Sequence, residues 1–195
     1  MIELALAAGI GLALGVVTGM PIGVVNVAII DAATRGQQRF AIGIGIGGAL
    51  ADTAHAAIAF VGVGRVVTEH PSWSKLLAVV AALVIITYAL IVRRPRARTT
   101  RSTHGIATGL LLTLPNPAAL GAWVAVAAVL WPRIALAPAL SLALGVGLGS
   151  AAWFVMLARV IAKLPADHRV ARALPRIATI LLVAIAIIGV TRAFS

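Results

Sequence analysis

The sequence predicts an all-α integral membrane protein with six transmembrane helices. They form two inverted three-helix repeats, whose first and fourth helices are broken. Three observations lead to this prediction. The 195 residues are 62% hydrophobic and 11% charged, whereas a soluble domain has roughly 25% charged residues. The length accommodates six apolar runs of about 20 residues with short connections. Prolines interrupt two of these runs, at Pro21 and, about half a chain later, at Pro115.

The first apolar run covers about residues 4–30 and contains the interrupted stretch Thr18–Asn26. Pro21 removes a backbone donor and clashes with the preceding turn, so carbonyl groups near it lose their helical partners. Inside a membrane this is tolerated only where the backbone is packed against protein or lines a cavity. Because Glu3 stands where a signal peptide would be basic, we expect an uncleaved first span. The polar stretch 34–39 is the first loop.

The second run, about 40–66, begins with a glycine-rich stretch. Glycines four residues apart, such as Gly43 and Gly47, allow two helices to approach closely. No P-loop Lys or Thr accompanies them, so the stretch predicts tight helix packing and not a phosphate loop. After a polar connection, residues 73–92 form the third predicted span.

A basic segment at 93–104 links the two halves of the chain. The fourth run, about 105–131, contains the second interrupted stretch, Thr113–Pro117. The fifth run covers about 135–162 and the sixth about 175–193. Paired proline-interrupted segments at corresponding places in two halves are typical of a transporter's binding site.

We therefore predict a single transmembrane domain over 1–195, with repeat 1 at about 1–92, the linker at 93–104 and repeat 2 at about 105–195. Three spans per half would insert equivalent halves with opposite orientation. In this arrangement twelve Lys and Arg residues fall on one side and four on the other. The positive-inside rule then places the linker in the cytoplasm and both termini outside, in a multi-pass protein of the cell membrane.

Composition also excludes several classes of protein. The net charge of +11 comes mostly from arginines in the short connections, which fits membrane topology better than nucleic-acid binding. The chain has no cysteine, so disulfides, thiolate metal sites and thiol redox relays are excluded. Neither Ser141 nor Ser150 lies in a nucleophile elbow. We expect no enzyme activity, no catalytic residue, no resident metal and no cofactor.

Asp52 is the one carboxylate well inside an apolar run. A central Asp costs about 2.5 to 3.5 kcal/mol on insertion scales, so it should face the protein interior or water. It could couple transport to protons, balance the charge of an ammonium group, or simply bond to broken backbone nearby. His55, three residues later, shares its helix face. This pair could relay a proton, but it offers too few ligands for a transition metal, and His55 could equally be a packed histidine.

Asn26 and Asn116 stand beside the two breaks, where an amide can cap freed backbone groups or bind a substrate. Helix ends at the breaks offer donors to an anion and carbonyls to a cation, as a zwitterion requires. Trp123 and Trp153 could line a cavity or pack in the core. The predicted substrate and ion pathway comprises Pro21, Gly23, Asn26, Asp52, His55, Pro115, Asn116, Pro117, Trp123 and Trp153.

These stretches resemble the lysine exporter (LysE/RhtB) family of small six-span efflux proteins. The resemblance rests on Pro21–Ile30, on the glycine-rich second run with Asp52, on Leu114–Pro117, and on Gly149–Phe154. Together they cover nearly the whole chain in the family's order.

The resemblance implies export of amino acids or related small metabolites, driven by an ion gradient, with Asn26, Asp52 and Asn116 near the central pathway. The expected partners are this small solute and the lipid bilayer, and the glycine-rich faces are compatible with a homodimer. Two alternatives stay open: an exporter of metal cations or other ions from the same broad superfamily, and a membrane assembly or lipid-related protein without a solute pathway.

Overall fold

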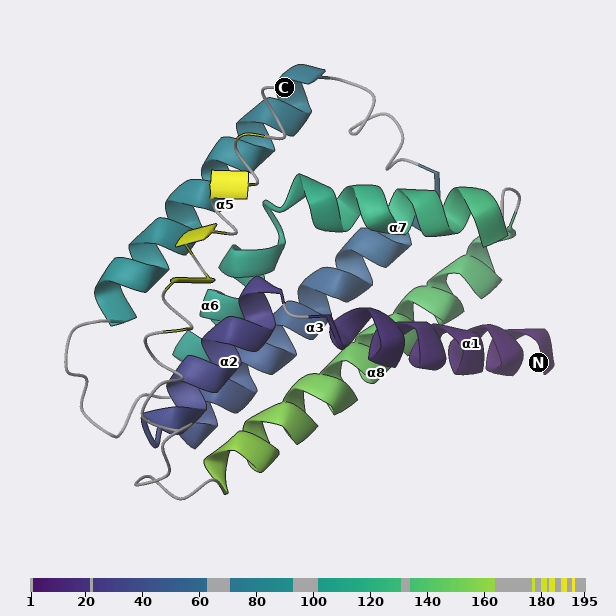
Figure 1. The fold of residues 1–195 in the computed structure, drawn as a ribbon. Coiled ribbons are helices and arrows are strands. Elements are labelled where there is room, and N and C mark those ends of the chain that lie inside the picture. The colour runs from purple at the N-terminus through teal and green to yellow at the C-terminus, as the bar shows by residue number, and fades with distance from the viewer. Residues whose placement is uncertain are drawn as a thin grey trace.

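The computed structural model describes residues 2–21, 23–62, 71–92, 102–130 and 134–163, and single positions at 177, 180, 181, 183, 184, 187, 188 and 191. Seven named helices lie in this part of the chain (Figure 1): α1 (Ile2–Gly19), α2 (Val24–Thr34), α3 (Gln38–Phe60), α5 (Pro71–Val92), α6 (Ser102–Thr113), α7 (Pro117–Leu130) and α8 (Leu136–Ala162). The prediction of a helical membrane protein agrees with this architecture.

The first apolar run is broken where Pro21 predicts it. Helix α1 ends at Gly19 and α2 begins at Val24. Gly23 is the N-cap residue in an extended conformation, and its carbonyl accepts the first bond of α2, from Val27 N at 3.0 Å. The predicted break in the first run is confirmed, and the run forms the two helices α1 and α2.

The second run ends earlier than the apolar pattern suggests. Helix α3 stops at Phe60, and Gly62 follows with a φ of 91°. This left-handed conformation is the usual glycine ending of a helix. The remainder of the predicted run, from residue 63 on, lies outside the described residues.

The fourth run is also broken, between α6 and α7, which meet at an angle of 68°. Pro117 is the first residue of α7, a position where its missing N–H costs nothing and its fixed φ suits the helix. The proline that ends one helix is thus followed by another that starts the next.

Three described helices are long and apolar enough to cross a membrane, namely α1, α3 and α8, and a fourth span is added if α6 and α7 are taken as one. The predicted number of six is therefore not confirmed, and inverted repeats stay a prediction. The linker from 93 to 101 and most of the predicted sixth span lie outside the described residues.

Helices α3 and α8 form the centre of the bundle and run antiparallel (Figure 1), since Gly45 of α3 lies against Phe154 and Gly147 of α8 lies against Thr53. Helix α1 packs along α8, and α6 packs along α3. Helix α5 contacts α6 and α7. Two buried apolar clusters, one including Val25 and the other Trp123, fill the spaces between these helices.

Glycines set two close helix crossings. A Cβ added at Gly11 or Gly15 of α1 would overlap backbone carbonyl oxygens of α8, and one added at Gly145 or Gly149 of α8 would overlap carbonyl oxygens of α1. Each helix therefore uses a pair of glycines four residues apart to admit the other's backbone. Small residues at such spacing are what close helix packing in membranes requires.

The second crossing repeats this device. Gly105 and Gly109 of α6 lie against the backbone of α3, and Gly47 of α3 lies against the Ile106 carbonyl of α6. The close packing predicted for the glycine-rich second run is confirmed. The spacing is the same in both helices. The two crossing glycines of α1 lie ten and six residues before Pro21, and the two glycines of α6 lie ten and six residues before Pro115.

Candidate functional site at the two helix breaks

Asn26 closes the first break. Its Nδ2 donates hydrogen bonds to the carbonyl oxygens of Gly19, at 2.8 Å, and of Pro21, at 2.7 Å. These carbonyls lose their helical partners where α1 ends, and an amide with two N–H donors satisfies both. The predicted capping role of Asn26 is confirmed.

Trp153 of α8 completes this arrangement. Its Nε1 donates a hydrogen bond to Asn26 Oδ1 at 3.2 Å. The indole also lies against Gly19, where an added Cβ would be 3.1 Å from Trp153 Cδ1. The Asn26 amide therefore has partners on both its oxygen and its nitrogen, and Trp153 fixes which way the amide points.

Asn116 caps the helix after the second break. Its Oδ1 accepts hydrogen bonds from the backbone N–H groups of Ala118, at 3.1 Å, and Ala119, at 3.4 Å. This is the N-cap arrangement, which satisfies donors in the first turn of α7. The predicted capping role of Asn116 is confirmed as well. Pro115 and Pro117 beside it are partly exposed.

His55 of α3 reaches the same break from the other side. Its Nε2 lies 3.1 Å from the Leu114 carbonyl oxygen. In an unbroken helix this carbonyl would accept the N–H of Ala118, but that N–H bonds to Asn116 instead. His55 therefore satisfies a carbonyl that the break has freed.

Asp52 lies on α3, three residues before His55. Its hydrogen-bonding side-chain neighbour is Ser150 of α8, whose hydroxyl also lies 3.4 Å from the Gly15 carbonyl oxygen of α1. Ser150 is fully buried, whereas Asp52 is only partly buried. The carboxylate thus stands where α1, α3 and α8 meet.

Gly48, one turn before Asp52, is where the other elements converge. A Cβ added to it would lie 2.9 Å from Val25 Cγ1 in the first turn of α2 and 3.4 Å from Phe154 Cε2 of α8, and Gly109 of α6 packs on its backbone. Val25 follows the first break, and His55 bonds to the second. Both breaks therefore lie against two turns of α3, about 10 Å long at 1.5 Å per residue.

This arrangement gathers several polar groups within an apolar bundle. A backbone carbonyl oxygen keeps a second lone pair beside the hydrogen bond it accepts, so the carbonyls at the breaks can also coordinate a cation or an ammonium group, and Asp52 can carry negative charge. Trp123, by contrast, is buried in an apolar cluster, its ring centroid 6.4 Å from that of Phe60. Pro21 is exposed and Gly23 partly exposed at the first break.

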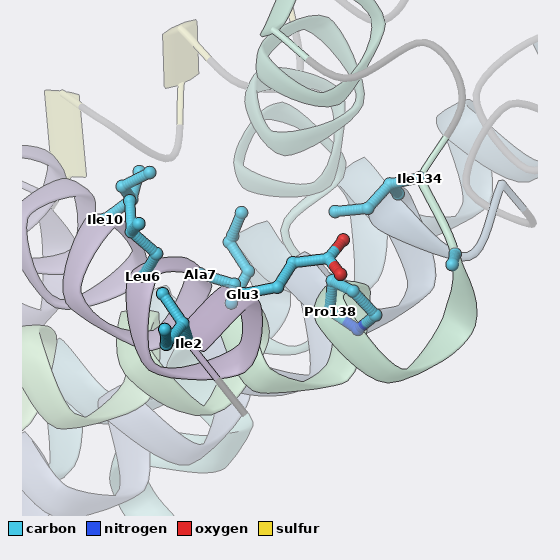
Figure 2. Close-up of a pocket in the computed structure, with 9 residues that line it drawn as sticks. Ile2, Glu3, Leu6, Ala7, Ile10, Ile134 and Pro138 are labelled. Carbon is cyan, nitrogen blue, oxygen red and sulfur yellow. The ribbon is translucent and has the colours of Figure 1, made fainter.

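A pocket of about 640 Å³ lies elsewhere, between the start of α1 and the start of α8. Figure 2 shows the Glu3 carboxylate pointing towards Ile134 and Pro138 across this pocket. Its other lining residues are apolar, and none of the predicted pathway residues is among them. The first turn of α1, which lines it, is about 18 Å along the helix from Gly15, which faces Ser150.

The sequence prediction missed two members of the site. The sequence offers Ser150 only as a candidate nucleophile, yet the residue faces Asp52. Its place directly after Gly149 is the available signal, since that glycine brings α1 and α8 together. The Leu114 carbonyl is backbone, and only the proline that follows it indicates that it is freed. Asp31, 2% exposed, forms an ion pair with Arg35 at 2.9 Å, which the four-residue spacing of the two residues could have indicated.

A known family matches almost the whole chain. The family model described as LysE type translocator matches residues 16–193, which include both breaks, Asp52 and His55. The chain belongs to this family. As a LysE type translocator it is a multi-pass membrane transport protein of the export type, and the family is one of transporters and not of enzymes. Neither the curated proteins nor the solved structures gave a match.

Proposed function

We propose that this LysE type translocator exports amino acids or related small metabolites across the cytoplasmic membrane, driven by an ion gradient. The observation that supports it most is the position of the two breaks against one stretch of α3, which carries Asp52 between Gly48 and His55. Discontinuous helices form the substrate and ion site of many secondary transporters.

The proposed solute is zwitterionic because the site has groups for both charges. Asp52 and the carbonyl oxygens at the breaks suit an ammonium group. Half-helix N-termini attract a carboxylate, and α2 begins at the first break and α7 at the second. Asn26, Asp52 and Asn116 are the residues we assign to the pathway.

The proposal includes two inverted three-helix repeats. The helix packing supports it. Helix α1 of the first repeat crosses α8 of the second, and α6 of the second repeat crosses α3 of the first, with paired glycines in both crossings. The proposed topology has the basic linker in the cytoplasm and both termini outside, from the distribution of Lys and Arg. The glycine faces used in these crossings lie inside the bundle, so a homodimer would need other surfaces.

Proteoliposome counterflow tests the function. Purified protein is reconstituted with one unlabelled amino acid inside, and uptake of the labelled amino acid is measured across a panel. Transient accumulation above equilibrium is expected for at least one amino acid. Accumulation of a divalent cation instead would favour the metal-exporter alternative, and no accumulation of any solute would favour the assembly or lipid-related one.

The Asp52→Asn variant tests the proposed role of the carboxylate. Removing a charge that binds a cation costs about 1.5 to 3 kcal/mol, so gradient-driven efflux should fall about ten- to a hundredfold. Glu3→Gln is the matched control, because Glu3 lies at the start of α1, away from the breaks. Normal efflux by Asp52→Asn, at equal amounts of protein in the membrane, would exclude this role.

A further inference from the structure

The hydrogen bond between His55 and Leu114 determines the tautomer of a buried imidazole. His55 is 3% exposed, and its Nε2 lies 3.1 Å from the Leu114 carbonyl oxygen. A carbonyl oxygen only accepts hydrogen bonds, so Nε2 must carry the hydrogen. In the neutral ring, Nδ1 then has a lone pair and no proton.

That second nitrogen has no partner in the described part of the chain. His55 Nδ1 is the one buried side-chain nitrogen or oxygen there without a hydrogen bond. Leaving a buried acceptor unsatisfied costs about 1 to 3 kcal/mol. The buried amide of Asn26 and the hydroxyl of Ser150 both have partners. The open position at Nδ1 is therefore a specific feature of this histidine.

Few charged groups face the imidazole. On α3 itself Asp52 lies three residues earlier, on the same face. Of the helices packed on α3, α7 has no titratable residue, and α6 has only His104, beside Gly105, which packs near Phe40 at the far end of α3.

The two remaining neighbours, α2 and α8, also keep their charges away from His55. Asp31 of α2 is paired with Arg35 near the loop that precedes α3. Arg159 of α8 lies beyond Phe154, which packs against Gly45, and so towards the start of α3. Asp52 is thus the described carboxylate placed to balance a charge on His55.

We infer that Nδ1 of His55 is a proton-binding site, and that the proton it binds is the ion coupled to transport. The inference rests on the proposed function and names its coupling ion. In the step, a hydronium ion gives its proton to the Nδ1 lone pair, leaving water and an imidazolium ring. Release to water on the other side of the membrane reverses the step. No other bond is made or broken.

Protonation would act on the second break directly. An imidazolium N–H makes a shorter and roughly twice as strong a hydrogen bond as a neutral one. The bond from Nε2 to the Leu114 carbonyl would therefore tighten when Nδ1 takes up a proton, and this carbonyl belongs to the break between α6 and α7. Binding of the proton and the geometry of the break are linked through one ring.

The first break has a matching ring that cannot respond in this way. Trp153 of α8 donates its Nε1 hydrogen to Asn26, as His55 of α3 donates to Leu114. An indole N–H is a donor only and does not titrate. Of the two breaks, the second is thus the one that a proton controls.

His55→Gln separates proton binding from the bond to Leu114. A glutamine amide N–H can still donate to this carbonyl but cannot take up a proton. We expect the variant to lose the response to a pH gradient, while counterflow, which needs no coupled ion, falls much less. For the wild type, one pH unit should change solute accumulation about tenfold per coupled proton. His104→Gln, an exposed histidine of α6, should behave as the wild type.

Two results would overturn the inference. One is a His55→Gln variant that still accumulates solute in response to the pH gradient. The other is loss of counterflow and of the pH response together, at unchanged thermal stability, which would make His55 a contact for the solute.

A readout without transport separates this inference from the proposed function. Nitrogen-15 NMR of histidine-labelled protein in micelles distinguishes bare from protonated Nδ1, and the signal missing in His55→Gln identifies His55. We expect a neutral ring with bare Nδ1 that gains a proton there as the pH is lowered. A ring that stays neutral until the protein unfolds would refute the inference. If the wild type moves no amino acid, the proposed function fails, and this titration still decides the role of His55.

Discussion

Asn26 and Asn116 perform the same kind of task with different parts of the side chain. The amide nitrogen of Asn26 donates to two carbonyls at the end of α1, whereas the amide oxygen of Asn116 accepts from two N–H groups at the start of α7. Asn26 is buried and Asn116 is partly exposed. Loss of the first should cost more, because water can replace a partner only where it has access.

Replacing Asn26 by alanine should lower the free energy of unfolding by about 1 to 3 kcal/mol, since two carbonyls near Gly19 lose their donor. Asn116→Ala should cost about 1 kcal/mol, as for an N-cap residue. Thr108→Ala is the control, because its hydroxyl only supplements a bond within its own helix. Thermal unfolding in detergent micelles measures which of the variants loses more stability. Equal losses for the two asparagines would show that Asn26 is not the main support of the first break.

At the scale of the helix, the glycine crossings were predicted only in part. Four-residue spacing of glycines indicates a close approach, and the backbone contacts of Gly47 and Gly149 confirm it. The spacing does not tell which helix approaches. It depends on the crossing geometry, which brings α6 to α3 and α1 to α8.

Gly109→Ala should destabilise the protein by about 1 to 3 kcal/mol, because the new Cβ would overlap the Ile44 carbonyl and force the helices apart. Gly121 of α7 has no other atom within 4 Å of an added Cβ. Gly121→Ala should therefore be neutral or slightly stabilising, through the higher helix propensity of alanine. Thermal unfolding of the two variants side by side measures this, and a harmless Gly109→Ala would refute the close crossing.

At the scale of the whole molecule, the proposed topology predicts which connections face the cytoplasm and which face the outside. The chain has no cysteine, so single cysteines can be introduced without a background. Ala97→Cys lies in the basic linker, outside the described residues, and Ala135→Cys lies at the start of α8. An impermeant maleimide should label the cysteine at 135 in intact cells and the one at 97 only after permeabilisation. The reverse pattern would invert the topology.

The sequence by itself determined the membrane class, the two breaks and the residues that cap them. These are local properties: apolar composition, the missing N–H of Pro21 and Pro117, and a short amide side chain a few residues away. Each acts within one or two turns of the chain, so the residue types and their spacing were sufficient.

Only the tertiary structure decided which side chains meet at the breaks. Trp153 bonds to Asn26 across 127 residues, and His55 bonds to Leu114 across 59. The approach of Ser150 to Asp52 is of the same kind. These pairs form because glycine crossings hold α1 on α8 and α6 on α3 in a fixed register along the helix axes. Residue spacing within one helix does not determine its register against another helix. The open Nδ1 of His55 therefore follows only from the packed structure.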